Sequence, residues 1–242
     1  MVVWALFDSE TTTVAKALPE HEVYSFGIGS GMEHIHLDLS DFETAVKELK
    51  KYPKPDVIFA SPPCESWVLI NSGSKRFYTK EHGKNFYWKN KWTGFDFTEK
   101  AKNIRLNGIN TAITTAKIIL YFKPRYWAIE NGNNSMIFDY IRDLGELSAG
   151  VRNKCNYFSY GFNILKRTII YSNVMLILKN IQPKQKLFNV CEETRKSLDL
   201  FGLDKILTYK ERSKVPPLLY RDIMHQFEHG GQKTLFPMEE IA

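Results

Sequence analysis

The first sixty residues alternate between short apolar runs and amphipathic segments, which is the pattern of strands separated by helices. The predicted strands span 2–7, 21–26 and 56–60. The predicted helices span 13–18 and 42–52. Strands at this spacing favour a parallel sheet, and the ligands of such sheets bind at the carboxyl ends of the strands. The loops that follow these three strands are therefore the first places to look for a site.

The same pattern resumes beyond residue 110. The predicted helices span 112–122, 136–147 and 218–227, and the last of them starts after Pro216 and Pro217 because proline is tolerated in a first helical turn. The predicted strands span 126–130, 157–160 and 167–172, with 174–178 extending the last one. We therefore expect an α/β fold with a mostly parallel sheet.

Residues 66–105 interrupt this pattern with a basic and aromatic stretch that holds nine Lys and Arg against three acidic residues. An insert of this length inside a compact domain is usually functional, and basic side chains mixed with aromatic ones suit phosphate contact and base stacking. The alternative is a solvated charged loop with a few aromatic side chains in the core. The candidate nucleic-acid contacts in this stretch are Ser66, Lys75, Arg76, Lys84, Lys89 and Lys91.

The composition is that of a globular chain, with 43% hydrophobic and 25% charged residues, and it excludes disorder along the whole length. Lys and Arg outnumber Asp and Glu by 33 to 27, and this net charge of +6 favours a polyanionic partner. Neither a membrane span nor a signal peptide is predicted. The 3 cysteines cannot form a disulfide framework, and we identify no CxxC motif, HExxH motif or paired-histidine spacing, so we expect a cytoplasmic protein without a metal.

A cysteine follows the third predicted strand, in the sequence Ser61-Pro62-Pro63-Cys64. The two prolines restrict the backbone and present Cys64 at the edge of the sheet. Cys64 is a candidate nucleophile if nearby positive charge favours its thiolate. The alternative is a structural cysteine buried in a turn.

A carboxylate closes the strand at 126–130, in the sequence Glu130-Asn131-Gly132. A carboxyl group at the end of an apolar strand is expected to be partly desolvated, which raises its pKa and suits a proton donor. The alternative is that this segment caps the following helix. A nucleophilic Cys64 and an acidic Glu130 at the same edge of one sheet would form a specific combination.

Six segments resemble motifs of the DNA cytosine-5 methyltransferase family, especially its short phage-type members, and they follow one another along the chain in the same order as in that family. The resemblance extends from Trp4 to Ile223. Segment 56–64 resembles the catalytic motif, and 123–131 resembles the Glu-Asn motif. The other four are the cofactor-like segments 5–18 and 36–39, the arginine-bearing strand pair at 160–168, and the closing motif at 212–217.

The resemblance implies a Rossmann-like, S-adenosylmethionine-dependent methyltransferase fold with helices on both faces of the sheet. It divides the chain into a catalytic domain at 1–172, a short target-recognition region at 173–211 and a C-terminal helical region at 212–242 that packs back on the catalytic domain. The insert at 66–105 would be a mobile catalytic and DNA-binding loop. The implied partner is double-stranded DNA, and the implied protein is a monomer in the cytoplasm of a bacterial or phage-infected cell.

The resemblance also assigns roles to residues. Cys64 attacks C6 of a flipped-out cytosine, Glu130 holds and protonates N3, and Arg167 contacts the base or the backbone, after which C5 takes the methyl group of S-adenosylmethionine. Asn131 and Lys166 are expected to contact nucleic acid. The implied cofactor-binding residues are Phe7, Asp8, Ser9, Glu10, Thr11, Gly27, Asp38 and Pro62.

The sequence departs from the family pattern chiefly on the cofactor side. The loop after Phe7 has no glycine, although the family uses glycine there to let the backbone approach the cofactor, and the second strand leads to Gly27 instead of an acid. Leu165 stands where the family has Gln, and Ile169 where a second arginine is usual. Two alternatives therefore remain beside an active methyltransferase: a DNA-binding protein that transfers no methyl group, and an enzyme with an altered cofactor or donor.

Overall fold

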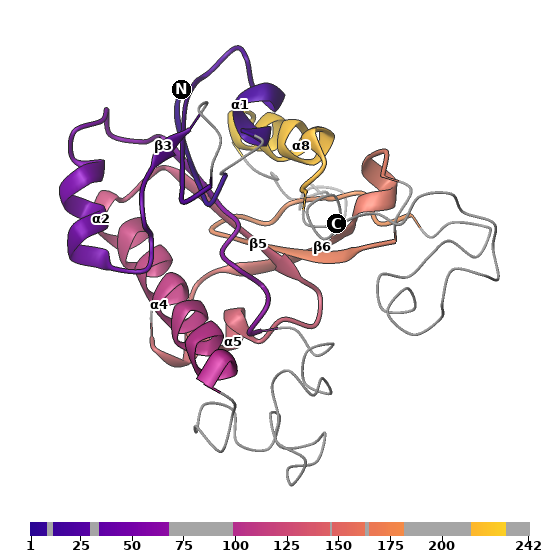
Figure 1. Cartoon of the computed structure of the whole chain (residues 1–242). Helices are drawn as coiled ribbons and strands as arrows, with labels where there is room; N and C mark the ends of the chain where they lie inside the picture. Colours follow the sequence, from indigo (N-terminus) through magenta and orange to yellow (C-terminus); the bar gives the residue numbers. More distant parts are fainter. Residues whose placement is uncertain are drawn as a thin grey trace, which may run out of the picture.

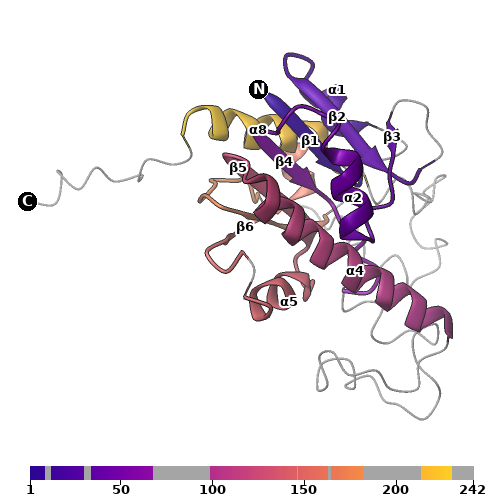
Figure 2. The same cartoon turned by 90° about the vertical axis from the view of Figure 1, so that its left-hand side faces the viewer.

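The chain builds a seven-stranded β-sheet with helices on both faces (Figures 1 and 2). This computed structural model describes residues 1–8, 12–29, 34–67, 99–145, 147–162, 165–181 and 214–230. The strands are β1 (Val2–Leu6), β2 (Glu22–Gly27), β3 (Ile35–His36), β4 (Val57–Ala60), β5 (Tyr126–Gly132), β6 (Val151–Asn156) and β7 (Arg167–Ser172). The helices are α1 (Thr13–Ala17), α2 (Phe42–Leu49), α4 (Glu99–Phe122), α5 (Ile137–Asp143), α8 (Pro217–Glu228) and the short 3-10 helix η2 (Tyr157–Tyr160).

The strand order is β3-β2-β1-β4-β5-β7-β6. The first five strands in this order pair in parallel, whereas β7 runs antiparallel between β5 and β6. The carboxyl ends of β1, β2, β4 and β5 therefore meet at one edge of the sheet. The predicted fold class, a Rossmann-like α/β fold with a mostly parallel sheet and helices on both faces, is confirmed.

The strands β1, β4 and β5 are apolar along most of their length because helices cover both faces of the sheet. Trp4, Ile58 and Trp127 belong to the core on the face covered by α2, α4 and α5. Phe59 and Tyr126 belong to the core on the opposite face, which α1 and α8 cover. Alternate residues of each strand thus serve two separate layers of packing.

Helix α8 returns from the far end of the chain to support the middle of the sheet. It begins with Pro217 in its first turn, as the sequence predicts. Its Tyr220 ring lies 5.2 Å from the ring of Phe59 in β4, and its Phe227 ring stacks on Tyr126 of β5 at 4.8 Å. In the described ranges, no helix is both long and apolar enough to cross a membrane.

The predicted strand at 157–160 is wrong, since these residues form η2 and the strand that pairs with β7 is β6 at Val151–Asn156. Asn156 ends β6 and caps η2, because its side-chain oxygen accepts a hydrogen bond from the Ser159 amide at 3.0 Å. Gly161 ends the turn with a positive φ of 87°. Strand β6 lies at the edge of the sheet and carries exposed Arg152 and Lys154, so its sequence lacks an apolar run.

Two other boundaries differ from the prediction. The segment at 174–178 is not a strand. Its backbone bonds to a side chain instead of a neighbouring strand, since the Asn153 side-chain oxygen accepts a hydrogen bond from the Leu176 amide at 2.8 Å. Helix α4 begins at Glu99 instead of 112, so the last part of the 66–105 insert is helical. Most of the predicted target-recognition region at 173–211 lies outside the described residues.

Candidate functional site

Cys64 lies just beyond the carboxyl end of β4. Strand β4 ends at Ala60, and the Ser61 amide still donates to the Leu6 carbonyl of β1 at 3.2 Å, so the loop leaves the sheet in a defined direction. The Cys64 carbonyl accepts a hydrogen bond from the Trp67 amide at 3.0 Å, which closes a turn around the thiol. The thiol is free and half-buried.

Glu130 and Asn131 lie at the carboxyl end of β5, beside this loop. Ala60 pairs with Ile129, so Glu130 is one residue beyond the last pair between β4 and β5. The Asn131 amide donates to the Pro62 carbonyl at 3.0 Å, and its side chain is completely buried. Asn131 and Pro62 therefore join the two segments that carry Cys64 and Glu130. Because both polar ends of the Asn131 amide are engaged within the protein, direct contact with nucleic acid does not fit its placement.

Glu130 is held by the side chains of Tyr157, the first residue of η2, and Lys166, which directly precedes β7. The Tyr157 hydroxyl donates to Glu130 Oε1 at 2.6 Å, and Lys166 Nζ lies 3.7 Å from the same oxygen. The Lys166 ammonium also stands over the Tyr157 ring, 4.5 Å from its centroid. The Tyr157 amide donates to the Lys166 carbonyl at 3.0 Å, so the backbone holds these two residues together as well.

The Cys64 thiol is subject to opposing influences. Burial raises its pKa, the Lys166 ammonium lowers it, and the Glu130 carboxylate raises it. Lys166 is therefore the group that favours the thiolate, while the resting thiol stays protonated. Cys155 on β6 responds to the same two charges, but burial raises its pKa to about 12, and this makes it an inert structural cysteine.

Arg167 is not part of this group of interacting side chains. It is exposed at the start of β7, where its carbonyl accepts from the Asn133 amide at 3.1 Å. Side chains alternate between the two faces of a strand, so Arg167 lies on the same face of β7 as Ile169. Glu130 pairs with Ile170 and lies on the opposite face of the sheet. The structure thus brings Lys166, rather than Arg167, to Cys64 and Glu130.

The predicted cofactor residues that are described lie along the neighbouring part of the same edge. Phe7 follows β1, Gly27 ends β2 and Asp38 lies two residues beyond β3. Phe7 is half-buried and has a positive φ of 66°, which is unusual for a residue other than glycine. Gly27 is buried and its carbonyl accepts from the Leu37 amide at 2.8 Å, whereas Asp38 is exposed.

Asp8 is directed at its own chain. Its carboxylate accepts from the Thr13 amide at 2.8 Å, the Val14 amide at 3.1 Å and the Ser25 hydroxyl at 2.9 Å, and so it binds the first turn of α1. Burial raises the pKa of Asp8 to about 6 despite these hydrogen bonds. Thr12 joins this turn with a positive φ of 42°, a costly conformation for a β-branched residue.

Ser66 is buried where the Cys64 loop meets α4. A Cβ added to Gly108 of α4 would lie 1.8 Å from Ser66 Oγ and 3.1 Å from Trp67 Nε1, so any larger residue would force the Ser66 side chain to move. The Trp67 carbonyl accepts from the Met136 amide at 3.1 Å, which ties the same loop to the start of α5. Gly108 and Tyr157 are not among the residues predicted from the sequence. A glycine within a helix often marks a close approach of another segment, and this signal could have identified Gly108.

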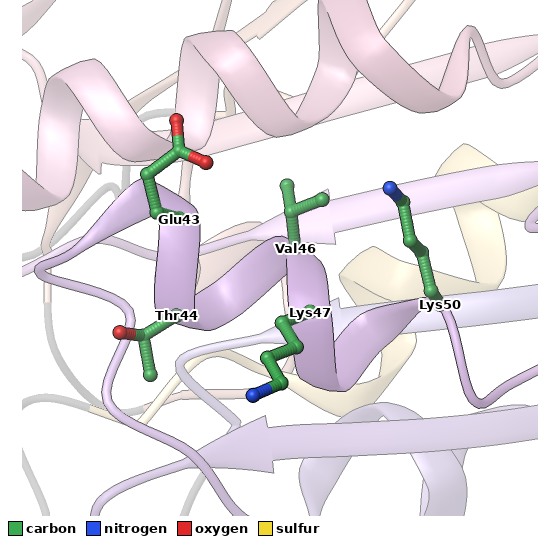
Figure 3. A pocket seen from close by; sticks show the side chains of 5 residues that line it. All are labelled: Glu43, Thr44, Val46, Lys47 and Lys50. Atoms are coloured by element: carbon green, nitrogen blue, oxygen red, sulfur yellow. The ribbon is translucent and has the colours of Figure 1, made fainter.

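Eight of the predicted site residues lie outside the described residues. They are Ser9, Glu10 and Thr11 on the cofactor side, and Lys75, Arg76, Lys84, Lys89 and Lys91 on the nucleic-acid side. A surface pocket of about 440 Å³ lies elsewhere, along α2 (Figure 3). It contains none of the predicted site residues; its lining is Glu43, Thr44, Val46, Lys47 and Lys50.

Comparison with known proteins finds no family model that matches the chain. It also finds no match among curated proteins. Among solved structures, a protein described as a DNA modification methyltransferase encoded within an E. coli prophage is 13% identical, with a TM-score of 0.41 over 71% of this chain and 46% of that one. The Entamoeba histolytica methyltransferase EhMeth is 13% identical, with a TM-score of 0.46 over 75% of this chain and 57% of that one. The chain thus spans about half the length of these structures.

Proposed function

We propose that this chain is a DNA cytosine-5 methyltransferase that uses S-adenosylmethionine. The observation that carries the proposal is the placement of Cys64 and Glu130 at the carboxyl ends of the neighbouring strands β4 and β5. The hydrogen bond from Asn131 to Pro62 joins these ends, and Lys166 acts on both reactive groups. A nucleophile beside an acid, at the edge where parallel sheets bind their ligands, suits attack on a heterocyclic base.

The chemistry follows from the electronic structure of cytosine, whose C5 is too weakly nucleophilic to take a methyl group directly. Attack by the Cys64 thiolate forms an Sγ–C6 bond while Glu130 protonates N3, and this makes C5 nucleophilic. S-adenosylmethionine would supply the methyl group. Water then takes the C5 proton, the Sγ–C6 bond breaks to release the Cys64 thiolate, and N3 returns its proton to Glu130. The base must first leave the stack, at a cost of a few kcal/mol.

Two side chains prepare Cys64 and Glu130 for these roles. The Lys166 ammonium lowers the pKa of Cys64 against the effect of burial, and therefore increases the fraction of thiolate. The Tyr157 hydroxyl fixes one oxygen of Glu130 at 2.6 Å and leaves the other free to meet N3. Lys166 would thus be the cation that acts on both groups in this site, and Tyr157 would orient the Glu130 carboxyl group.

The cofactor side fits the proposal in part. Phe7, Gly27 and Asp38 lie at the ends of adjacent strands, where a nucleoside would lie in an open α/β sheet. Phe7 and Gly27 would contact its base and sugar, and exposed Asp38 would accept hydrogen bonds from it. Asp8 does not fit a ligand role, because α1 and Ser25 occupy its carboxylate.

The test is methyl transfer to duplex DNA, together with trapping of the covalent step. Purified protein, labelled S-adenosylmethionine and mixed-sequence DNA should yield 5-methylcytosine, and DNA containing 5-fluorocytosine should retain the protein because no C5 proton can leave. Cys64→Ala should abolish both signals. Cys155→Ala is the matched control, since it removes a thiol that the same charges surround yet keeps the nucleophile. Wild-type protein that binds DNA and cofactor without forming 5-methylcytosine would refute the proposal.

A second function, DNA binding without methyl transfer, has one observation in its favour. The Asp8 carboxylate occupies the first turn of α1 at the cofactor edge, and a negative ligand group cannot use the same amides. Calorimetric titration with S-adenosylmethionine, with and without duplex DNA, separates the two functions. A micromolar affinity, about −8 kcal/mol, supports the enzyme. Salt-dependent DNA binding without any affinity for the cofactor supports the alternative.

A further inference from the structure

The last turn of α8 and the residue after it carry two histidines and a glutamate on one exposed surface. His225, Glu228 and His229 are spaced i, i+3 and i+4, and one possible ligand atom from each lies within 4.8 Å of the others. The two imidazole rings are 4.2 Å apart. Such spacing places side chains together on a helix, and the expectation from the sequence that no paired-histidine spacing occurs is therefore wrong.

The hydrogen bond of His229 prepares this ring to bind a cation. His229 Nδ1 lies 2.7 Å from the His225 carbonyl oxygen, which can only accept, so Nδ1 carries the proton. The lone pair is therefore on Nε2, at the outer end of the ring. Histidines that ligate metals are commonly oriented in this way, by donating their other N–H to a backbone carbonyl.

The Glu228 carboxylate lies beside a buried imidazole. His21 Nε2 lies 3.2 Å from Glu228 Oε1 and 3.5 Å from Glu20 Oε1, and His21 Nδ1 lies 3.4 Å from the N-terminal ammonium of Met1. The contact between His21 and Glu228 lacks the geometry of a hydrogen bond, so it brings the two side chains together without fixing the direction of the carboxylate. The Glu228 side chain is 38% exposed, and its carboxylate is therefore open to a cation beside the two imidazoles.

We propose that His225, Glu228 and His229 form a binding site for a divalent transition-metal ion, with Zn²⁺ as the ion that these ligands suit best. Two imidazoles and one carboxylate match the nitrogen and oxygen ligands of zinc, and a water completes the tetrahedron. A hard cation such as Mg²⁺ prefers oxygen ligands and is excluded by the two histidines. The C-terminal end of a helix also carries partial negative charge, which favours a bound cation.

The site would link two distant parts of the chain. Glu228 ends α8, and His21 immediately precedes β2, so zinc bound to Glu228 would strengthen the contact between them. Helix α8 in turn supports the candidate active site, where the Tyr220 hydroxyl lies 3.4 Å from the Ser61 hydroxyl. The inference does not depend on the proposed function, because it rests on other residues.

The experiment is titration of the full-length, metal-free protein with Zn²⁺ by calorimetry, with Co²⁺ as a probe of tetrahedral coordination by its visible absorption. One equivalent of Zn²⁺ should bind and should raise the melting temperature, whereas Mg²⁺ should do neither. His225→Ala and His229→Ala should each weaken binding at least about tenfold. Glu228→Gln, whose side-chain oxygen remains beside the two imidazoles, should weaken it less.

His36→Ala is the matched control, since His36 is an exposed histidine on β3, outside the cluster. It should leave the Zn²⁺ affinity unchanged. All three substituted ligands are exposed, so circular dichroism should show native helix content in each variant. Equal Zn²⁺ affinity in the wild type and both histidine variants would overturn the proposal, as would the absence of any Zn²⁺-dependent rise in the melting temperature of the wild type.

Discussion

The carboxyl edge of the sheet has two parts that use their polar side chains in opposite ways. Beyond β4 and β5, polar groups surround the two groups that we propose to be reactive: buried Tyr157 and half-buried Lys166 hold Glu130, and Lys166 also lowers the pKa of Cys64. Beyond β1 and β2, the buried Asp8 carboxylate satisfies the backbone of α1 and the Ser25 hydroxyl.

This difference separates polar side chains that suit a chemical role, beyond β4 and β5, from one that has a structural role, beyond β1. A lysine, a tyrosine and a carboxylate could be replaced by apolar side chains if packing were their only purpose, since burying charge is costly. At the β1 side, by contrast, the acid meets a structural need, because the first amides of a helix have no carbonyl partner within the helix, and Asp8 accepts from two of them in α1. The proposed base chemistry accordingly belongs to the β4–β5 part of the edge. At the β1–β2 part, the proposed cofactor binding is left to Phe7, Gly27 and Asp38.

The largest expected effect is that of removing the acid. Glu130→Gln keeps an oxygen that can accept the 2.6 Å hydrogen bond from Tyr157, but it has no proton to give to N3. The rate of 5-methylcytosine formation should fall by roughly 10²–10⁴-fold. The measurement is single-turnover methyl transfer, and Glu43→Gln on α2 is the control. A rate within about threefold of the wild type would remove Glu130 from the mechanism.

A pH titration tests the architectural role assigned to Asp8. Burial raises its pKa to about 6 from the ordinary 3.8, so the folded protein holds this proton more tightly than the unfolded chain. The free energy of unfolding should therefore decrease as pH rises from about 4 to about 6, by about 3 kcal/mol from this group. The Asp8→Asn variant should lack this decrease.

The measurement is urea denaturation of the wild type and Asp8→Asn at several pH values. Other carboxyl groups contribute equally to both proteins, so the difference between the two curves isolates Asp8. Parallel curves between about pH 4 and pH 7 would show that Asp8 is not desolvated.

The charge near Cys64 can be tested without any substrate. Lys166→Met should raise the pKa of Cys64 further, because the ammonium is the group that lowers it. Alkylation of Cys64 at constant pH, followed by mass spectrometry, should slow by roughly tenfold. Arg167→Met should leave the rate unchanged, since Arg167 does not act on the thiol. An equal decrease of the alkylation rate in both variants would show that Arg167 also acts on the Cys64 thiol.

The smallest effect concerns the support of the Cys64 loop. An alanine inside a helix normally stabilises a protein by about 1 kcal/mol relative to glycine. At Gly108 the sign should be reversed, with a loss of roughly 1–3 kcal/mol, because the added Cβ would meet Ser66 Oγ at 1.8 Å. Thermal denaturation measures the change, and a stabilised Gly108→Ala protein would show that the loop can move away from α4 without cost.

The sequence by itself was sufficient to predict the order of most strands and helices and the position of the reactive pair. Buried strands of a parallel sheet are continuous apolar runs, and their carboxyl ends share an edge, so Cys64 and Glu130 could be placed together without coordinates. Strand β6 could not be predicted in this way, because at the edge of the sheet it has an exposed face with Arg152 and Lys154.

Only the tertiary structure decided which side chains surround the reactive pair. Lys166 and Arg167 are adjacent in sequence, yet they lie in different places. The backbone hydrogen bond from Tyr157 holds Lys166 near Glu130, whereas Arg167 begins β7. The partners of Glu130 and Gly108 come from segments far away along the chain, and Asp8 meets Ser25 of β2 as well as its local partners in α1. No local pattern encodes the contacts between distant segments. Periodicity reports which face of an element is buried, whereas the identity of the neighbour on that face depends on how the elements pack.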